Sequence, residues 1–592
     1  MLLAAVLSFT DVCAAVAISP LQQQDMAANA TAFFPSVADE QIERAALSRS
    51  LEDARQHQNG GSFERFSVFE ELFGRCLKHH GYFQLLSLQN TGDAAASESL
   101  DRVDEICEAA SNDARSVLLA TPDSEPWTRR YLSLRERAER ARAHAVKEDA
   151  KALADTASDN IDRLSRLHGL ILQTPPFERI AAGRRHLDAY FDYITLMRDP
   201  EPAVRRQAWF AYWKGIRARS QPFAEILLGI VQNEQAIAHA KGYADAPASR
   251  YAAMGLDREA VEASLHAMAR HASSWQAYSV LQGSVPWDRV APPNRFTHHL
   301  TLHELAQVGV RAVAPLGDNH AGQLLRLLDS DNGRMDISQQ RRARAMDAFS
   351  ITAPGAPSVL FVGYRRDDLE SDVEVIHEAA HAVHGELMNE AGTSPLTRNG
   401  PSWMMESFAI LDELLFRQQL AQEARTPQAR DYYLRSLIDD LALQLFTSAE
   451  EAQLELAIYD GVASGSLNSA DDLNAVTDQV LSHYERSSSS DAELGMTWAT
   501  KRLFYQDPMY LTNYLYAGLV AVKLLSLTHA EDATFQARYR ALEEQGFGRD
   551  PVRALEETLG GQIDWNRLID EDIVFFDHQV DALRALRSGQ AH

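Results

Sequence analysis

The chain has 592 residues, 45% of them hydrophobic, which is enough apolar material for a large core and more than one lobe. Its formal net charge of −26 argues against nucleic acid or an anionic membrane surface as a partner. No membrane insertion is expected, because the most apolar helical stretch, residues 510–527, carries Lys523.

Residues 1–17 are a candidate signal sequence. An apolar run is followed by an Ala-x-Ala end at Ala17, which is compatible with cleavage there. The positive charge expected before such a run is missing, since the first basic residue is Arg44. The sequence therefore favours export over a cytoplasmic location by a small margin. After processing, Cys76 and Cys107 would remain, either as one disulfide or as two free thiols.

Most of the chain has the apolar periodicity of helices. The predicted helices are 101–116, 126–151, 160–172, 202–243, 257–281, 427–463 and 471–485. One convincing strand, 358–364, is rich in β-branched and aromatic residues. We predict a mainly α fold, with an N-terminal helical lobe at 18–200 and a second region at 201–592.

The motif with the clearest chemistry is His377-Glu378-Ala379-Ala380-His381. On a helix, residues at i and i+4 share a face, so both imidazoles can reach one metal ion. Glu378 is rotated from His377 by about 100° and can act on a water without binding the metal. Two imidazoles beside a carboxylate base are typical of zinc hydrolases. The alternative is a pair of core histidines satisfied by hydrogen bonds.

A catalytic zinc needs a third protein ligand. His384 is unsuitable, because it lies about 10 Å along the axis from His377. Glu406 lies early in the next predicted helix, among the apolar residues of 403–408, where a carboxylate is costly unless it is paired or bound to metal. We therefore predict Glu406 as the third ligand. Glu413, two turns later on the same face, is predicted to hold a ligand in place, or else to be a solvated position.

This pattern, with a glutamate 25 residues after the second histidine (406 − 381), resembles the thimet oligopeptidase and oligoendopeptidase F family of zinc metallopeptidases. The resemblance covers residues from about 200 to the end. It implies one zinc ion, short peptide substrates and a two-lobed helical fold around a deep substrate channel. It also implies that 358–364 is an edge strand along which the peptide lies. The Ala379-Ala380 pair departs from the family, which usually has glycine at the second position.

Two tyrosines near the C-terminus form a further candidate group. Asp507-Pro508 predicts a helix start, so that Tyr510 and Tyr514 project from one face. Their hydroxyls could donate to an oxyanion or to substrate carbonyls, or the rings could fill the core. The resembled family has a histidine just before such tyrosines. Here the nearest match in spacing is Tyr505, which leaves the full donor set open.

The predicted function is that of a zinc metalloendopeptidase acting on short peptides, with Glu378 as general base. One alternative is a zinc carboxypeptidase or dipeptidyl-carboxypeptidase, which needs a cationic pocket. The residues that could supply it are Arg365, Arg366 and Lys501-Arg502. Another alternative is an inactive peptide-binding protein. His299 and His303 also lie four residues apart, but no glutamate helix follows them, and we expect a surface or core-edge cluster.

Overall fold

The computed structural model describes residues 26–590, apart from 57–59, 284, 339–343, 346–347, 485–492 and 531. Helices make up most of this part of the chain, which confirms the mainly α prediction. The candidate signal sequence lies outside the described residues and stays a prediction.

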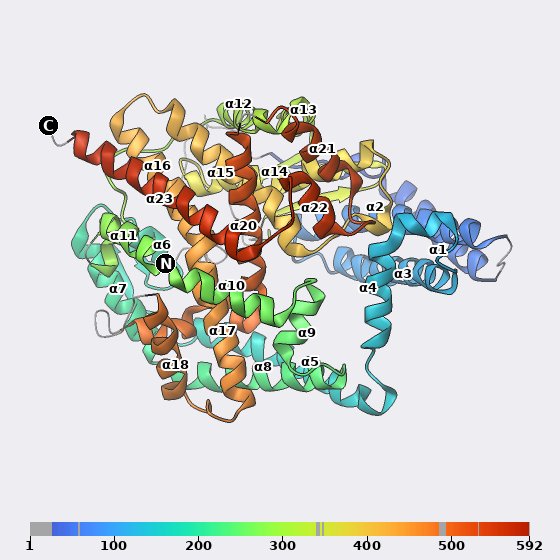
Figure 1. Ribbon diagram of the computed structural model, residues 1–592, viewed down its shortest axis with the longest axis horizontal. Helices are drawn as coiled ribbons and strands as arrows, with labels where there is room; N and C mark the ends of the chain where they lie inside the picture. The colour runs from blue at the N-terminus through green and yellow to red at the C-terminus, as the bar shows by residue number, and fades with distance from the viewer. Residues whose placement is uncertain are drawn as a thin grey trace.

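The first four long helices gather at one side of the molecule, where they are drawn in blue (Figure 1). They are α1 (Val37–Gln56), α2 (Ser62–Gln89), α3 (Ala94–Ala120) and α4 (Leu132–Ala143). A disulfide between Cys76 and Cys107 joins α2 to α3 and decides between the two alternatives for these cysteines. The apolar faces of these helices form a core with residues of the small sheet, among them Ile351 and Phe361.

Nine further helices follow up to residue 327. They are α5 (Glu148–Gln173), α6 (Tyr193–Met197), α7 (Pro202–Arg217), α8 (Ser220–Ala240), α9 (Ala246–Ala253), α10 (Arg258–Arg270), α11 (Ala272–Gln282), α12 (Leu302–Val313) and α13 (Asp318–Leu327). The predicted helices 126–151, 202–243 and 257–281 are each broken in two. At the second break, Arg219 donates to the carbonyls of Ile171 and Gly215 and so fixes the corner between α7 and α8. The boundary predicted near residue 200 stays a prediction.

The strands form two small sheets. β1 (Arg179–Ala182) and β2 (Arg185–Asp188) make a hairpin, and β3 (Met335–Ser338), β4 (Phe349–Ala353) and β5 (Ala356–Gly363) make a sheet in the order β3-β5-β4. The predicted strand 358–364 is therefore confirmed as a strand, but its prediction as an edge is wrong. β5 is central, and its nearly continuous apolar run reflects burial on both sides.

The edge strand beside β5 is β4, which pairs with it antiparallel. The opposite edge, that of β3, is covered by an antiparallel bridge between Met26 and Ile337. Within the described residues, β4 has no strand on its other side. In the part of the chain that the structure describes, this edge of the sheet is therefore unpaired.

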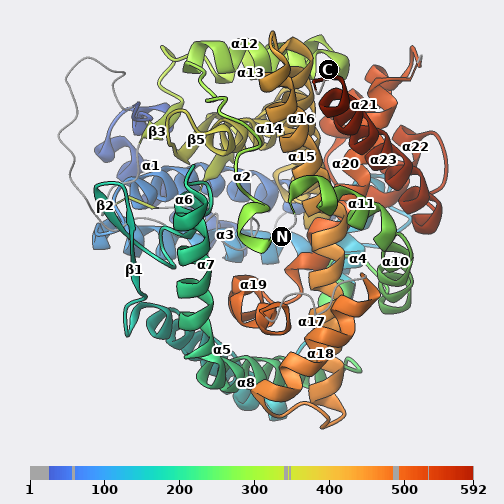
Figure 2. The same ribbon diagram turned by 90° about the vertical axis from the view of Figure 1, so that its left-hand side faces the viewer.

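The C-terminal part is again helical. It comprises α14 (Leu369–Glu390), α15 (Ser402–Glu423), α16 (Pro427–Ala442), α17 (Ser448–Ala463), α18 (Ala470–His483), α19 (Arg502–Gln506), α20 (Tyr510–Thr528), α21 (Phe535–Gln545), α22 (Pro551–Leu559) and α23 (Trp565–Gln590). A π-helical turn, Leu443–Thr447, joins α16 to α17. In both views α14 and α15 lie in the upper half of the molecule, and α5 and α8 lie at the lower end (Figures 1 and 2).

α20 is a core helix. Of the described helices it alone is long and apolar enough to cross a membrane, yet 72% of its apolar window is buried inside the protein. It packs along α15 and α17. Its apolar character therefore serves the core.

Candidate metal centre

Two neighbouring helices, α14 and α15, supply the candidate ligands. α14 carries two acidic residues, Glu370 and Asp372, in its first turn, where they favour helix formation. It ends just before Gly392, whose φ of 68° suits a chain reversal. α15 begins at Ser402, directly after Pro401, so that Glu406 lies early in the helix as the sequence predicted. The two helices pack against each other and bring residues 377–381 opposite Glu406.

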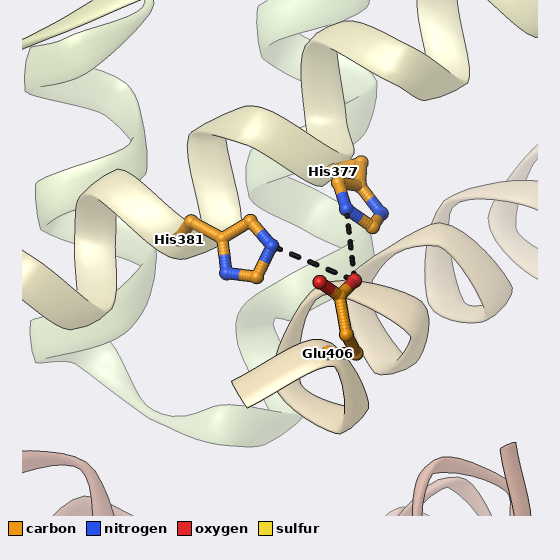
Figure 3. Close-up of side chains that lie close together, drawn as sticks. All are labelled: His377, His381 and Glu406. Atoms are coloured by element: carbon orange, nitrogen blue, oxygen red, sulfur yellow. Dashed lines mark ion pairs between the residues drawn. The ribbon is translucent and has the colours of Figure 1, made fainter. Parts of the chain in front are cut away.

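His377, His381 and Glu406 converge on one point (Figure 3). One ligand atom from each lies within 4.8 Å of the others. Nε2 of His377 is 3.5 Å from Oε2 of Glu406, and Nε2 of His381 is 3.8 Å from the same oxygen. The three side chains are 20%, 16% and 17% exposed, so the group can be reached from solvent.

Glu413 lies on the far side of His377. Its Oε1 is hydrogen-bonded to Nδ1 of His377. With Nδ1 held in this way, Nε2 of His377 faces Glu406 and His381. If the proton of the ring is on Nδ1, the lone pair of Nε2 is available to bind a cation. The structure thus brings Glu413 to the position expected of a group that holds a ligand in place.

The donor set fits a tetrahedral zinc ion. Nitrogen and oxygen ligands at about 2.0–2.1 Å from zinc lie about 3.4 Å apart, close to the separations seen here. Three carboxylates, Glu378, Glu406 and Glu413, surround the two imidazoles. Among the described residues, no lysine or arginine forms an ion pair with any of the three. The group therefore has negative charge that a divalent cation would balance.

The pKa values of the ligands reflect the same excess of negative charge. Burial alone would lower the pKa of His377, but the carboxylates of Glu413 and Glu406 hold it well above its ordinary value. Burial also opposes ionisation of Glu406, yet the hydrogen bond and charge of His377 lower its pKa to about 2. Burial and the charge of His377 lower the pKa of His381 to about 4, so its imidazole is neutral and able to bind metal.

Glu378 lies between the ligands and the edge strand. Burial and the carboxylates of Glu406 and Glu413 raise its pKa to about 7, against the opposing charge of His377. The backbone of Ser350 in β4 lies close enough to the Glu378 side chain to oppose this rise slightly. A carboxyl group with a pKa near neutrality can both accept and return a proton.

Tyr510 and Tyr514 lie at the same site. The hydroxyl of Tyr510 donates to Oε1 of Glu406 at 3.3 Å, and the ring of Tyr514 packs edge-on to that of Tyr510 at 5.1 Å. Burial, followed by the charge of Glu406, raises the pKa of both phenols, which keeps them protonated donors. Tyr505 lies elsewhere: it is fully buried and stacked on His168.

The helix start predicted at Asp507-Pro508 is wrong. α20 begins at Tyr510, after Met509 in a left-handed conformation with φ 66°. The buried carboxylate of Glu455 accepts a hydrogen bond from the Met509 backbone at 2.8 Å and stabilises this irregular entry. A contact between residues 54 positions apart leaves no local signal in the sequence.

The other histidines lie outside the centre. His384 is fully buried, with its ring against Phe408 and Phe547. His299 contacts Asp367 and His303 contacts Gln307, so these two point to different partners, as expected of a surface cluster.

Sequence reasoning missed β4 as part of the site. The residues Phe-Ser-Ile-Thr-Ala of 349–353 alternate between apolar and polar, and Pro354-Gly355 follows them as a turn signal. This hairpin pattern could have been found. The longer apolar run of β5 led us to predict 358–364, and not β4, as the edge strand.

Comparisons with known proteins find similar sequences and similar folds. The chain is 18% identical to an oligoendopeptidase F homologue of Lactococcus lactis subsp. lactis (strain IL1403) over 412 residues, 68% of this chain and 67% of that protein. Plasmid-encoded oligoendopeptidase F of Lactococcus lactis subsp. cremoris is 17% identical over 411 residues, with the same coverage. No protein-family model matches the chain.

Solved structures share the fold over nearly the whole chain. A candidate peptidase from Chlamydophila abortus superposes with a TM-score of 0.77 at 15% identity, covering 94% of this chain and 98% of that one. Oligoendopeptidase-F from Enterococcus faecium superposes with a TM-score of 0.64 at 15% identity, covering 93% and 100%. The chain is a relative of oligoendopeptidase F. The resemblance seen in the sequence is thereby confirmed. The similar sequences and structures support the assignment of this chain as a peptidase.

Proposed function

We propose that this oligoendopeptidase F relative is a zinc-dependent endopeptidase that hydrolyses peptide bonds in short oligopeptides. One observation carries the proposal: His377, His381 and Glu406 offer three converging donors. Glu378 follows His377 on the same exposed face, and Glu413 holds His377 from behind. This is the set of groups that metal-assisted hydrolysis requires.

His377, His381 and Glu406 would hold the ion. Bound there, zinc would supply a Lewis acid and make a water molecule acidic enough to attack a carbonyl at neutral pH. Glu378 accepts the proton that this water loses as its oxygen bonds to the carbonyl carbon. Glu378 then returns the proton to the amide nitrogen as the C–N bond breaks, which releases a carboxylate and an amine.

The remaining groups would position the substrate. The free edge of β4 can pair with an extended peptide through main-chain hydrogen bonds, which suits broad specificity. Tyr510 and Tyr514, kept protonated, would donate to the oxygen that gains charge during attack. A deep channel around the site remains part of the proposal.

Two of the four candidate cations for a carboxylate pocket already have carboxylate partners, which favours endopeptidase action, whereas Arg502 donates to the amide oxygen of Gln506. Lys501 is buried in an ion pair with Glu451, and Arg365 is paired with Asp368 at 2.8 Å. The C-terminal carboxylate of a substrate would have to compete with Glu451 and Asp368 for these two cations. Cleavage of one peptide with a free and with an amidated C-terminus tests this choice, and an endopeptidase should cut both.

The general base is tested by Glu378→Gln. We expect this variant to bind one zinc ion per chain but to lose about 10²- to 10⁴-fold in kcat, since the amide cannot accept the proton. Metal content and peptide cleavage are measured on the same sample. Glu390→Gln, an exposed position at the far end of α14, is the matched control. An undiminished kcat for Glu378→Gln would refute the assignment.

A further inference from the structure

α14 presents a single stripe of side chains to solvent near the metal centre. Between Ser371 and Gly385, every residue is buried except four: Glu374, His377, Glu378 and His381. His377, Glu378 and His381 follow Glu374 by three, four and seven residues, so all four lie on one face of the helix. Three of them have roles in the proposed hydrolysis. Glu374, one turn before Glu378, has none.

The carboxylate of Glu374 is not engaged by the protein. Within the described part of the chain, no hydrogen bond or ion pair reaches it. The positive charge that acts most strongly on Glu374 is that of Arg365, and this side chain is paired with Asp368. The two ring nitrogens of His377 face Glu413 and Glu406 instead. Glu374 therefore keeps its full capacity to accept hydrogen bonds from a ligand.

We propose that Glu374 is a specificity residue that receives a cationic group of the peptide substrate. The group is a lysine or arginine side chain, or the free amino terminus. This inference rests on the proposed peptidase function. One helical turn places Glu374 about 6 Å from Glu378 along the axis, and an extended peptide advances about 3.3 Å per residue. The cation therefore lies about two residues from the scissile bond.

The charge of the surroundings selects a cation over other polar groups. Glu374 and Glu378 are neighbouring carboxylates; burial, followed by their mutual repulsion, raises the pKa of Glu374 to about 7. A ligand cation relieves that repulsion. The net charge of −26 over the whole chain also draws cationic peptides towards the protein and repels anionic ones.

The test compares matched peptides that differ in one charge. Lysine is replaced by norleucine at each position within three residues of the cleaved bond, with the amino terminus free or acetylated. At one position we expect the wild-type protein to prefer lysine by about tenfold in kcat/KM, and Glu374→Gln to reduce that ratio to near one. Glu374→Lys should reverse the preference towards glutamate. Loss of the preference on acetylation identifies the amino terminus as the cation.

A control and a binding measurement keep this inference separate from the proposed function. Glu390→Gln removes a carboxylate from the same helix far from the stripe and should keep the wild-type ratio. The same peptides are titrated against the Glu378→Gln protein by calorimetry. Equal ratios in wild-type and Glu374→Gln overturn the inference alone. A charge preference in binding without any cleavage by the wild-type protein overturns the peptidase function alone, and no binding of any peptide overturns both.

Discussion

At the scale of single residues, the contact between Glu413 and His377 orients the His377 ring in the candidate metal centre. His377 is held between Glu413 and Glu406, whereas no carboxylate among the described residues supports His381 from behind in this way. A carboxylate behind a ligand histidine fixes its tautomer and raises its basicity. The two histidines of the motif are therefore not equivalent, although their sequence contexts look alike.

We expect Glu413→Ala to lower the affinity for zinc by about 10- to 100-fold, because His377 loses its acceptor. Glu413→Gln should lose less, since its amide oxygen still accepts from Nδ1. Affinity is measured by competition with a chelator of known strength. Glu423→Ala removes an exposed carboxylate from the same helix and serves as control. Equal affinities for Glu413→Ala and wild type would contradict this role.

At the scale of elements, the close approach of α14 to β4 sets the distance between Glu378, the proposed general base, and the strand edge. Gly385 makes this approach possible: a Cβ there would lie 2.7 Å from Cγ2 and 2.9 Å from Cβ of Thr352. Thr352 is β-branched and belongs to the edge strand, so it has little freedom to move aside. Gly385 thus allows α14 to lie close to β4, the strand that contains Ser350.

Gly385→Ala should therefore destabilise the protein by about 1–3 kcal/mol through overpacking, despite the better helix propensity of alanine. The measurement is the free energy of unfolding in denaturant. Gly169→Ala is the matched control, because that helical glycine has nothing within 4 Å of the added Cβ. The control should be neutral or slightly stabilising. A stabilised Gly385→Ala protein would show that α14 and β4 are not in close contact.

At the scale of the whole molecule, two large buried clusters meet at the sheet. One combines α1–α4 with the sheet, and the other contains most of the remaining core. The disulfide between Cys76 and Cys107 lies within the first cluster, with both sulfurs buried. Since α2 packs on β4, the stability of this cluster supports the edge strand of the site.

Replacing both cysteines by serine should lower the free energy of unfolding by about 3–4 kcal/mol, as the chain-entropy relation gives for a loop of about 31 residues. The sequence separation of the two cysteines is 31. Unfolding is followed in denaturant with and without a reducing agent. The reductant should weaken the wild-type protein and leave the double variant unchanged. An unaffected wild-type protein would mean that the bond does not stabilise the fold.

The sequence predicted the parts of the site that depend on local spacing. The four-residue interval of His377 and His381 and the unusual carboxylate at Glu406 were enough to bring the three donors together, as the structure has them. The irregular start of α20 could not be predicted, because it depends on Glu455 in a distant helix. The break in the predicted helix 202–243 has a similar cause, because Arg219 fixes that corner through the carbonyl of Ile171, 48 residues away.

The most direct test of the account is a metal titration of the purified chain. The protein is stripped with a chelator and zinc is added in steps, while bound metal and cleavage of a short peptide are followed together. The account predicts cleavage that is lost on stripping and returns in proportion to zinc, reaching its maximum at one ion per chain. Cleavage that persists at full rate in the stripped protein, or zinc binding that His381→Ala leaves unchanged, would contradict it.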